Sequence, residues 1–153
     1  MPKMFLKFAL IVIFSQLFTY YVAGIIAQLF LGASQFYPPS ETAIRYLKDP
    51  HAPSLQLLIL PAQALRGLLF AAVIFPLRTR ILELGKWYSG LALSGLIFVI
   101  GYVAASGGMI EHFVYFKAGD YPTKFAVITF VEVLIQSLLM GWMIAKLDKR
   151  FMD

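Results

Sequence analysis

Long apolar stretches alternate with short polar segments along the chain, and four of these stretches are long enough to be membrane-spanning helices. They cover Phe8 to Leu31, Leu55 to Leu77, Trp87 to Ser106 and Phe125 to Ala145. A helix needs about 20 mainly apolar residues to cross roughly 30 Å of hydrocarbon. Proline, glycine, aromatic or basic residues stand at the boundaries, as is typical of helix ends near a membrane surface. The pattern predicts an all-α membrane protein: a four-transmembrane-helix bundle that forms a single domain over residues 1–153.

The first apolar stretch also has the charge pattern of a secretory signal peptide. Lys3 and Lys7 lie at its N-terminal end, and Leu31-Gly32-Ala33 is a candidate cleavage site. The apolar core of a signal peptide has about 7–15 residues, however, and the stretch in this chain is about twice as long. We therefore expect it to be kept as the first span.

Basic residues in the connecting segments predict the orientation. Because cytoplasmic segments carry the excess of Lys and Arg, both termini are expected in the cytoplasm. We expect the membrane to be a bacterial cytoplasmic (inner) membrane. The two longer loops, residues 32–54 and 107–124, then lie on the outer side. Eight basic residues fall on the cytoplasmic side and four on the outer side: Lys3, Lys7, Arg78, Arg80, Lys86, Lys146, Lys149 and Arg150 against Arg45, Lys48, Lys117 and Lys124.

Composition supports the membrane class and narrows the chemistry. The chain is 60% hydrophobic and 14% charged, with a mean hydropathy of +0.78, whereas a soluble domain is about half apolar and about a quarter charged. The absence of cysteine excludes disulfides, iron–sulfur clusters, thiolate zinc sites and cysteine nucleophiles. The net charge of +5 comes mostly from the ends of the apolar stretches. It therefore indicates the lipid bilayer as a partner and not nucleic acid.

Two ionisable residues lie inside the predicted spans. Arg66 is near the middle of the second span, and Glu132 is about seven residues into the fourth. An ionisable residue at bilayer depth costs about 2.5–3.5 kcal/mol on insertion scales, so it needs a partner or water. Both spans start on the outer side, and helical side chains lean toward the helix N-terminus. The side chain of Arg66 can therefore extend toward Glu132, and the spacing allows an interhelical ion pair.

Other polar residues share helix faces with these two charges. Gln63 lies three residues before Arg66, and Gln136 lies four residues after Glu132, so that each amide is on the same face as its charged neighbour. The first span carries polar and small residues at every fourth position: Gln16, Tyr20, Gly24 and Gln28.

Glu111 and His112 follow a Gly-Gly pair at the outer end of the third span, where they can close over this cluster. We predict a ligand-binding site made of Arg66, Glu132, Gln63, Gln136, Glu111 and His112. A second interpretation stays open, in which the same polar residues only hold the helices together. Interhelical hydrogen bonds of that kind contribute about 0.6 kcal/mol each on average.

Short sequence motifs do not identify a catalytic or metal-binding function. Gly90 with Ser94, and Gly101 with Ala105, are pairs of small residues four apart, which is typical of closely packed helices. The metalloprotease, nucleophile-elbow, P-loop and dinucleotide-binding patterns are all absent from the sequence. We therefore assign no catalytic residue and no metal ligand, and we expect no cofactor.

Three functions fit this pattern, in the following order. The first is a protein that binds, or helps to move, a small polar or anionic ligand or a proton through an outward-facing polar pocket. Four spans are few for a transporter, so transport would need a homodimer or a larger membrane complex. The second is a non-catalytic membrane scaffold or accessory subunit. The third is an intramembrane enzyme that acts on a lipid or quinone, with a buried carboxylate as the acid or base. Because no nucleophile is evident, we favour a function without catalysis.

Overall fold

Helices make up every regular element in the part of the chain that the structure describes. The computed structural model describes residues 2–41, 43–44, 53–103 and 123–152. In chain order its elements are α1 (Pro2–Phe30), η1 (Ala33–Phe36), α2 (Pro53–Ile74), η2 (Phe75–Leu77), α3 (Arg78–Glu83), α4 (Lys86–Phe98), the π-helical segment η3 (Val99–Val103) and α6 (Thr123–Met152).

Three helical stretches are long and apolar enough to cross a membrane. They cover Lys3–Phe30, Leu57–Glu83 and Thr123–Asp148, with 28, 27 and 26 residues, and Trp87–Val103 forms a shorter apolar helix. These stretches match the first, second and fourth predicted spans. The shorter helix matches the described part of the third, whose last residues, 104–106, lie outside the described ranges. The expectation of an all-helical protein with long apolar helices is confirmed.

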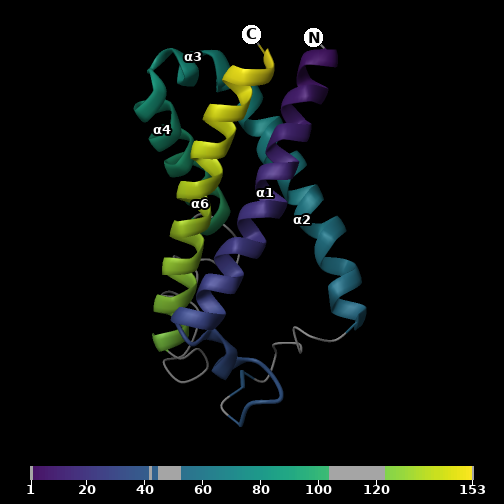
Figure 1. Ribbon diagram of the computed structural model, residues 1–153, viewed down its shortest axis with the longest axis vertical. Coiled ribbons are helices and arrows are strands. Elements are labelled where there is room, and N and C mark those ends of the chain that lie inside the picture. The colour runs from purple at the N-terminus through teal and green to yellow at the C-terminus, as the bar shows by residue number, and fades with distance from the viewer. Residues whose placement is uncertain (1, 42, 45–52, 104–122, 153) are drawn as a thin grey trace.

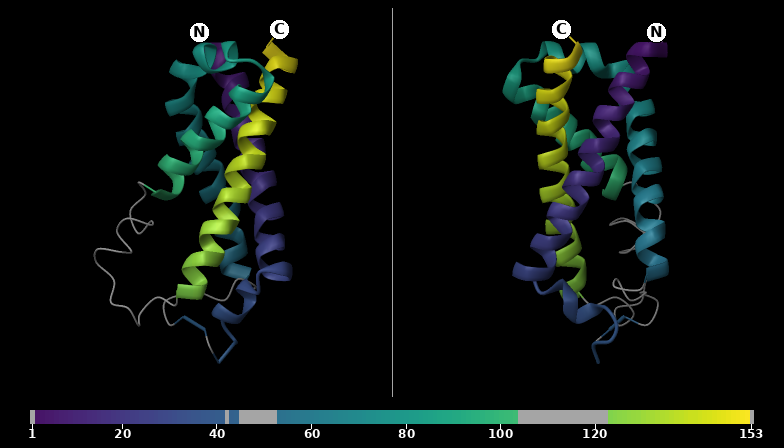
Figure 2. Two further views of the ribbon diagram at one scale, coloured as in Figure 1. Left: turned by 90° about the vertical axis from the view of Figure 1, so that its left-hand side faces the viewer. Right: turned by 45° about the vertical axis from the view of Figure 1, so that its right-hand side comes forward.

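Helix α1 is at the centre of the arrangement. It packs against both α2 and α6, and α6 packs against α4 on its other side. The N-terminus, the C-terminus and α3 lie together at one end of the molecule (Figure 1). From that end α1 and α2 diverge toward the opposite, loop-bearing end, and the second view in Figure 2 shows the same divergence. The helices are closest at Gly67, where an added Cβ atom would lie only 2.8 Å from the Cα atom of Ile13.

The contact between α4 and α6 depends on small residues. A Cβ atom added at Gly141 of α6 would lie 2.5 Å from the backbone nitrogen of Ser94 and 2.7 Å from the carbonyl oxygen of Gly90. The Ser94 hydroxyl donates across the contact to the Leu138 carbonyl over 3.3 Å. Close helix packing at Gly90 and Ser94, as predicted from their spacing, is therefore confirmed.

Two separate apolar clusters form the core. The larger is at the end that holds the termini, and α1, α2, α4 and α6 all contribute to it: Phe8, Ala9, Val12, Phe70, Ala71, Ile74, Leu93, Ile97, Met140, Ile144 and Ala145. The smaller is at the loop end and joins α1, η1 and α6: Ala27, Ala33, Phe36, Ile44, Phe125 and Ile128. Residues 13–26 of α1 and 129–139 of α6 lie between these clusters, and this intermediate level contains Glu132 and Gln136 of the predicted site.

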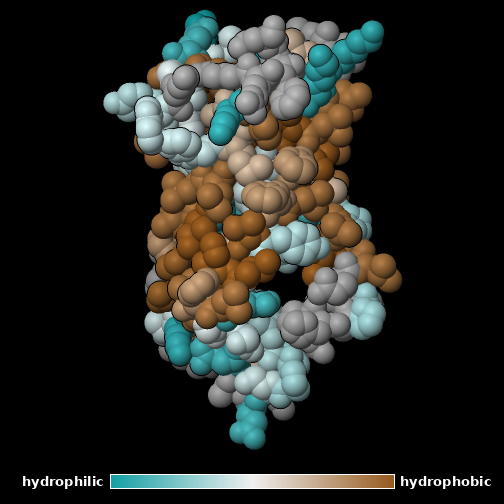
Figure 3. Space-filling view, in the orientation of Figure 1, coloured by the Kyte–Doolittle hydropathy of each residue, from teal (hydrophilic) through white to brown (hydrophobic). Residues whose placement is uncertain are grey.

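The outer surface of the bundle is apolar over its middle. A hydrophobic band covers this part of the molecule, and polar residues gather at both ends (Figure 3). Along α1 the outward face carries a continuous row of large apolar side chains: Leu6, Leu10, Phe14, Phe18, Ile25 and Leu29. Water does not favour so large an apolar surface, whereas lipid does. The surface and the long apolar helices together indicate an integral membrane protein.

Candidate functional site

The polar residues of α1 and α2 meet just below the point where these helices are closest. The Gln16 side-chain nitrogen donates a 2.7 Å hydrogen bond to the side-chain oxygen of Gln63. Gln16 is almost completely buried, and its own side-chain oxygen has no hydrogen-bond partner within the described ranges. This places Gln63 inside the bundle, and it shows that the polar stripe of the first span faces the second span.

Arg66 lies one turn further along α2 and contacts the third helix. Its Nη2 atom donates to the carbonyl oxygen of Gly101 over 2.8 Å, and the guanidinium carbon lies 5.7 Å from the ring centre of Phe70. Gly101 belongs to the π-helical segment η3. Such segments are rare, interrupt the normal hydrogen-bond ladder, and frequently occur at functional sites. Glycine favours this approach, because an added Cβ atom would lie 3.2 Å from Nη2 of Arg66 and 2.9 Å from Cζ of Phe70, so that these side chains would have to shift.

Glu132 lies on α6, against the stripe of α1 that also carries Gln16 and Tyr20. Its Oε1 atom is 3.8 Å from the position that a Cβ atom would take at Gly24, so the carboxylate lies directly against α1. Tyr20, one turn before Gly24, is close enough to interact electrostatically with both Glu132 and Arg66. Within the described part of the chain, Glu132 has no hydrogen bond or ion pair.

Arg66 and Glu132 do not form the ion pair that their spacing allows. No nitrogen–oxygen distance of 4.0 Å or less joins them in the described structure, where the ion pairs are Arg78–Asp148 and Arg80–Glu83. The physical reason is their different depth along α1: Gly67, next to Arg66, meets Ile13, whereas Glu132 meets Gly24, eleven residues further along α1. The sequence shows the depth of each charge within its own helix, but not which residues of α1 lie next to it.

Of the three remaining predicted site residues, the structure describes one. Gln136 is buried on the same face of α6 as Glu132, with 8% of its surface exposed. Glu111 and His112 lie outside the described residues. Tyr20 and the Gly101 carbonyl were not among the predicted site residues, yet both contribute to this level. The four-residue stripe on α1 was the signal for Tyr20, whereas a backbone carbonyl leaves no signal in the sequence.

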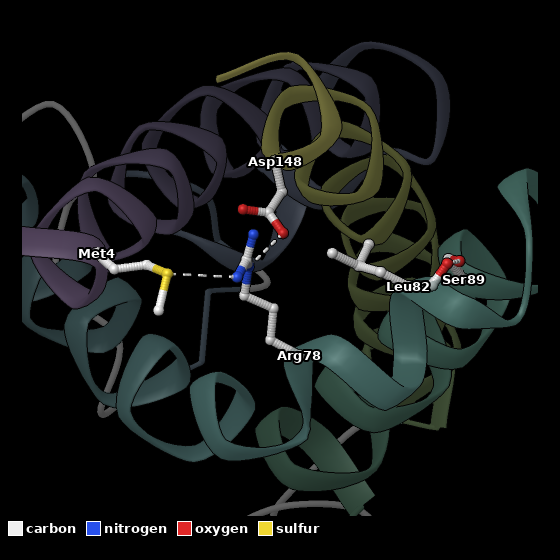
Figure 4. A network of polar contacts seen from close by, with 5 residues as sticks. All are labelled: Met4, Arg78, Leu82, Ser89 and Asp148. Carbon is white, nitrogen blue, oxygen red and sulfur yellow. Dashed lines mark hydrogen bonds and ion pairs between the residues drawn. The ribbon is translucent and has the colours of Figure 1, made fainter. Parts of the chain in front are cut away.

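A second pair of charges lies at the end that holds the termini. The Nε atom of Arg78 donates to the Oδ2 atom of Asp148 over 2.6 Å, and the Asp148 side chain is completely buried. The Arg78 guanidinium lies between this carboxylate and the Met4 sulfur, 3.9 Å away (Figure 4). The sequence analysis missed this pair because it ended the fourth span at Ala145. Helical periodicity gives the missing signal, since Met140, Ile144 and Asp148 are four residues apart on one buried face.

No match came from comparing the chain with protein-family models, curated proteins or solved structures. Within the described residues no group of three or more His, Cys, Asp or Glu side chains is arranged to hold a metal ion. The candidate site is therefore the polar level between the two apolar clusters, which consists of Gln16, Tyr20, Gln63, Arg66, Glu132 and Gln136.

Proposed function

We propose that this chain is a small membrane protein of four spans whose polar level binds, or helps to move, a small polar or anionic ligand or a proton. In this proposal both termini are in the cytoplasm, the membrane is a bacterial inner membrane, and the site opens toward the outer, loop-bearing side. In the loop-bearing half of the molecule the described atoms leave a lateral opening between α1 and the N-terminal half of α2 (Figure 3).

One observation carries the proposal: two opposite charges at bilayer depth are not paired with each other. Each costs about 2.5–3.5 kcal/mol to insert on biological scales. If their purpose were only to join helices, direct contact would be the arrangement that recovers most of this cost. The chain instead keeps Arg66 and Glu132 apart, at different positions along α1, and Glu132 has no hydrogen bond within the described structure. Charges kept in this way are typical of functional sites in membranes.

The residues have complementary roles in this proposal. Arg66 holds an anionic or polar group, because Gly101 engages only one of its several N–H donors in the described structure. Glu132 balances that charge or carries a proton. Gln63 and Gln136 orient the ligand through their amide groups. Because four helices are few for a transport path, movement across the membrane takes place in a homodimer or a larger complex.

Two interhelical hydrogen bonds favour a second candidate, a non-catalytic scaffold or accessory subunit. Gln16 with Gln63 joins α1 to α2, and Arg66 with Gly101 joins α2 to η3. In that function the polar level holds the helices in register and binds nothing. The unpaired carboxylate of Glu132 is what a scaffold leaves unexplained.

The coupling between Arg66 and Glu132 separates these two functions. Unfolding free energies are measured in detergent for Arg66→Leu, Glu132→Leu and the double variant, with the matching variants of Arg78 and Asp148 as the control cycle. For a binding site we expect the two effects to add within about 0.5 kcal/mol, whereas the control pair should couple by about 1–3 kcal/mol. Strong coupling between Arg66 and Glu132 would contradict the proposal and favour the scaffold.

A further inference from the structure

We infer that the polar level takes a zwitterion: a small molecule or headgroup that carries both an acid group and an ammonium group. This inference rests on the proposed binding function and names its ligand class. It is drawn from the balance of charge at this level, from the separation of the two charged side chains, and from the groups between them.

The balance of charge comes first. The four predicted spans contain one cation, Arg66, and one anion, Glu132. A simple anion at Arg66 would leave the Glu132 carboxylate without a partner and would be repelled by it. A simple cation at Glu132 would leave Arg66 in the same condition. In the low dielectric of a bilayer both arrangements are costly, so a ligand with both charges is the better match.

The separation of the charges points the same way. Arg66 and Glu132 are more than 4.0 Å apart at their nearest nitrogen and oxygen atoms, and both lie close to Tyr20 of α1. A zwitterion also keeps its acid and ammonium groups apart, by two or more bonds. Its acid group can accept hydrogen bonds from the guanidinium atoms that Gly101 does not engage, while its ammonium group donates to the Glu132 carboxylate.

The groups between the charges fit the middle of such a ligand. Tyr20 interacts electrostatically with both Arg66 and Glu132, and its phenol can both donate and accept a hydrogen bond. Gly24 presents no side chain toward the Glu132 carboxylate, whose Oε1 atom lies 3.8 Å from the position of an added Cβ atom, so a larger side chain there would displace it. A free amino acid and the headgroup of an ethanolamine phospholipid share this chemistry, and the experiment must distinguish the two sources.

The test uses the full chain purified in dodecyl maltoside. Thermal stabilisation is titrated with glycine, γ-aminobutyrate and glycerophosphoethanolamine, and with acetate and methylammonium as probes of a single charge. A second arm compares the chain in nanodiscs of phosphatidylethanolamine and of phosphatidylglycerol. We expect stabilisation by a zwitterion and not by either single-charge probe. Stabilisation by a soluble zwitterion indicates a free solute, whereas stabilisation by phosphatidylethanolamine alone indicates a lipid headgroup.

Three variants make the test specific. Arg66→Gln and Glu132→Gln should each weaken zwitterion binding at least about tenfold, because each removes a charged hydrogen bond. Gly24→Leu keeps both charges but displaces the Glu132 carboxylate, and it should abolish binding. Its control is Gly95→Leu, because a Cβ atom added at Gly95 meets nothing within 4 Å. Folding of each variant is checked by its helical circular dichroism and its elution volume.

Two results would overturn the inference. If acetate stabilises the chain as well as glycine does, and only Arg66→Gln removes the effect, the site takes a simple anion; the binding function then stands and the zwitterion does not. If no probe or lipid stabilises the chain, the zwitterion is wrong. The proposed binding function is also wrong only if Arg66 and Glu132 couple strongly in the stability cycle.

Discussion

The helical bundle contains two sets of oppositely charged residues, and the two sets differ in whether their charges are in contact. At the end with the termini, Arg78 and Asp148 are in direct contact, 2.6 Å apart, and the carboxylate is completely buried. At the intermediate level, Arg66 and Glu132 lie at different positions along α1 without contact. Both sets combine an arginine from the second helical stretch with an acid from α6. The same side-chain chemistry therefore has two different arrangements within one bundle.

The difference lies in what surrounds each set. Arg78 and Asp148 lie next to the larger apolar cluster, which includes Ile144 one turn before Asp148. A buried charge there is tolerated only when a partner satisfies it. Arg66 and Glu132 lie between the two apolar clusters, among amide and phenol groups. We therefore expect the first set to stabilise the fold, and the second is the one that we propose to bind a ligand.

Breaking the paired set should have the largest effect on stability. Arg78→Leu leaves the buried Asp148 carboxylate without its guanidinium, and we expect a loss of roughly 3–5 kcal/mol of unfolding free energy. Asp148→Leu should cost less, because the Arg78 side chain is 16% exposed and its freed guanidinium can reach water. Unfolding in mixed micelles measures both. Equal losses for the two variants would show that the burial of Asp148 does not control the effect.

Replacing each acid by its amide should lower the unfolding free energy in the first set but not in the second. Asp148→Asn removes a charged hydrogen bond to Arg78, with an expected loss of about 1.5–3 kcal/mol. Glu132→Gln removes a carboxylate that has no partner in the described structure, so we expect no loss of stability. The measurement is again the unfolding free energy, compared at one pH. A loss for Glu132→Gln as large as that for Asp148→Asn would show that Glu132 has a structural partner.

The same two amide variants should affect ligand binding in the opposite order. Glu132→Gln should change it, whereas Asp148→Asn should not. If Glu132 balances charge or carries a proton, Glu132→Gln should remove any pH dependence of binding or uptake. Asp148→Asn should keep that dependence, because it lies outside the site. Binding that depends on pH in the same way in both variants would exclude the proton role of Glu132.

The contact between Arg66 and η3 can be tested through Gly101. In Gly101→Ala the new methyl group would lie 2.9 Å from Phe70 and 3.2 Å from the Arg66 guanidinium. Overpacking of this kind costs about 1–3 kcal/mol. The matched control is Gly95→Ala on the same helix, where nothing lies within 4 Å and helix propensity favours alanine by about 1 kcal/mol. If both variants are equally stable, the close approach of Arg66 to Gly101 is not required.

The length of the apolar stretches was enough to predict the long helices. Apolar length located the three long helices, and the four-residue spacing of Gly90 and Ser94 located the close contact between α4 and α6. These features depend on residues near one another in the sequence, so a local pattern contains them. The role of Asp148 was missed for the opposite reason. Asp148 is polar, and a rule based on apolar composition stops before it although the buried face continues.

The candidate site was predictable only in part. The depth of Arg66 and Glu132 and the faces of Gln63 and Gln136 follow from helix geometry. Their mutual arrangement depends on which residues of α1 lie next to each charge, and that is not a local property. The donation from Arg66 to the Gly101 carbonyl was also out of reach, because every residue carries that group and only tertiary structure selects one.

The smallest effect should come from the ion pair that no apolar surroundings enclose. Arg80 and Glu83 are 3.3 Å apart, but their side chains are 87% and 57% exposed. An exposed pair of this kind contributes about 0.2–1 kcal/mol, so Arg80→Ala should change the unfolding free energy by about 0.5 kcal/mol or less. Added salt should reduce even that difference, because exposed charges are screened. A much larger loss would mean that ion pairs at this end of the molecule stabilise it without burial. The contrast between Arg78–Asp148 and the unpaired charges of the polar level could then no longer be attributed to their surroundings.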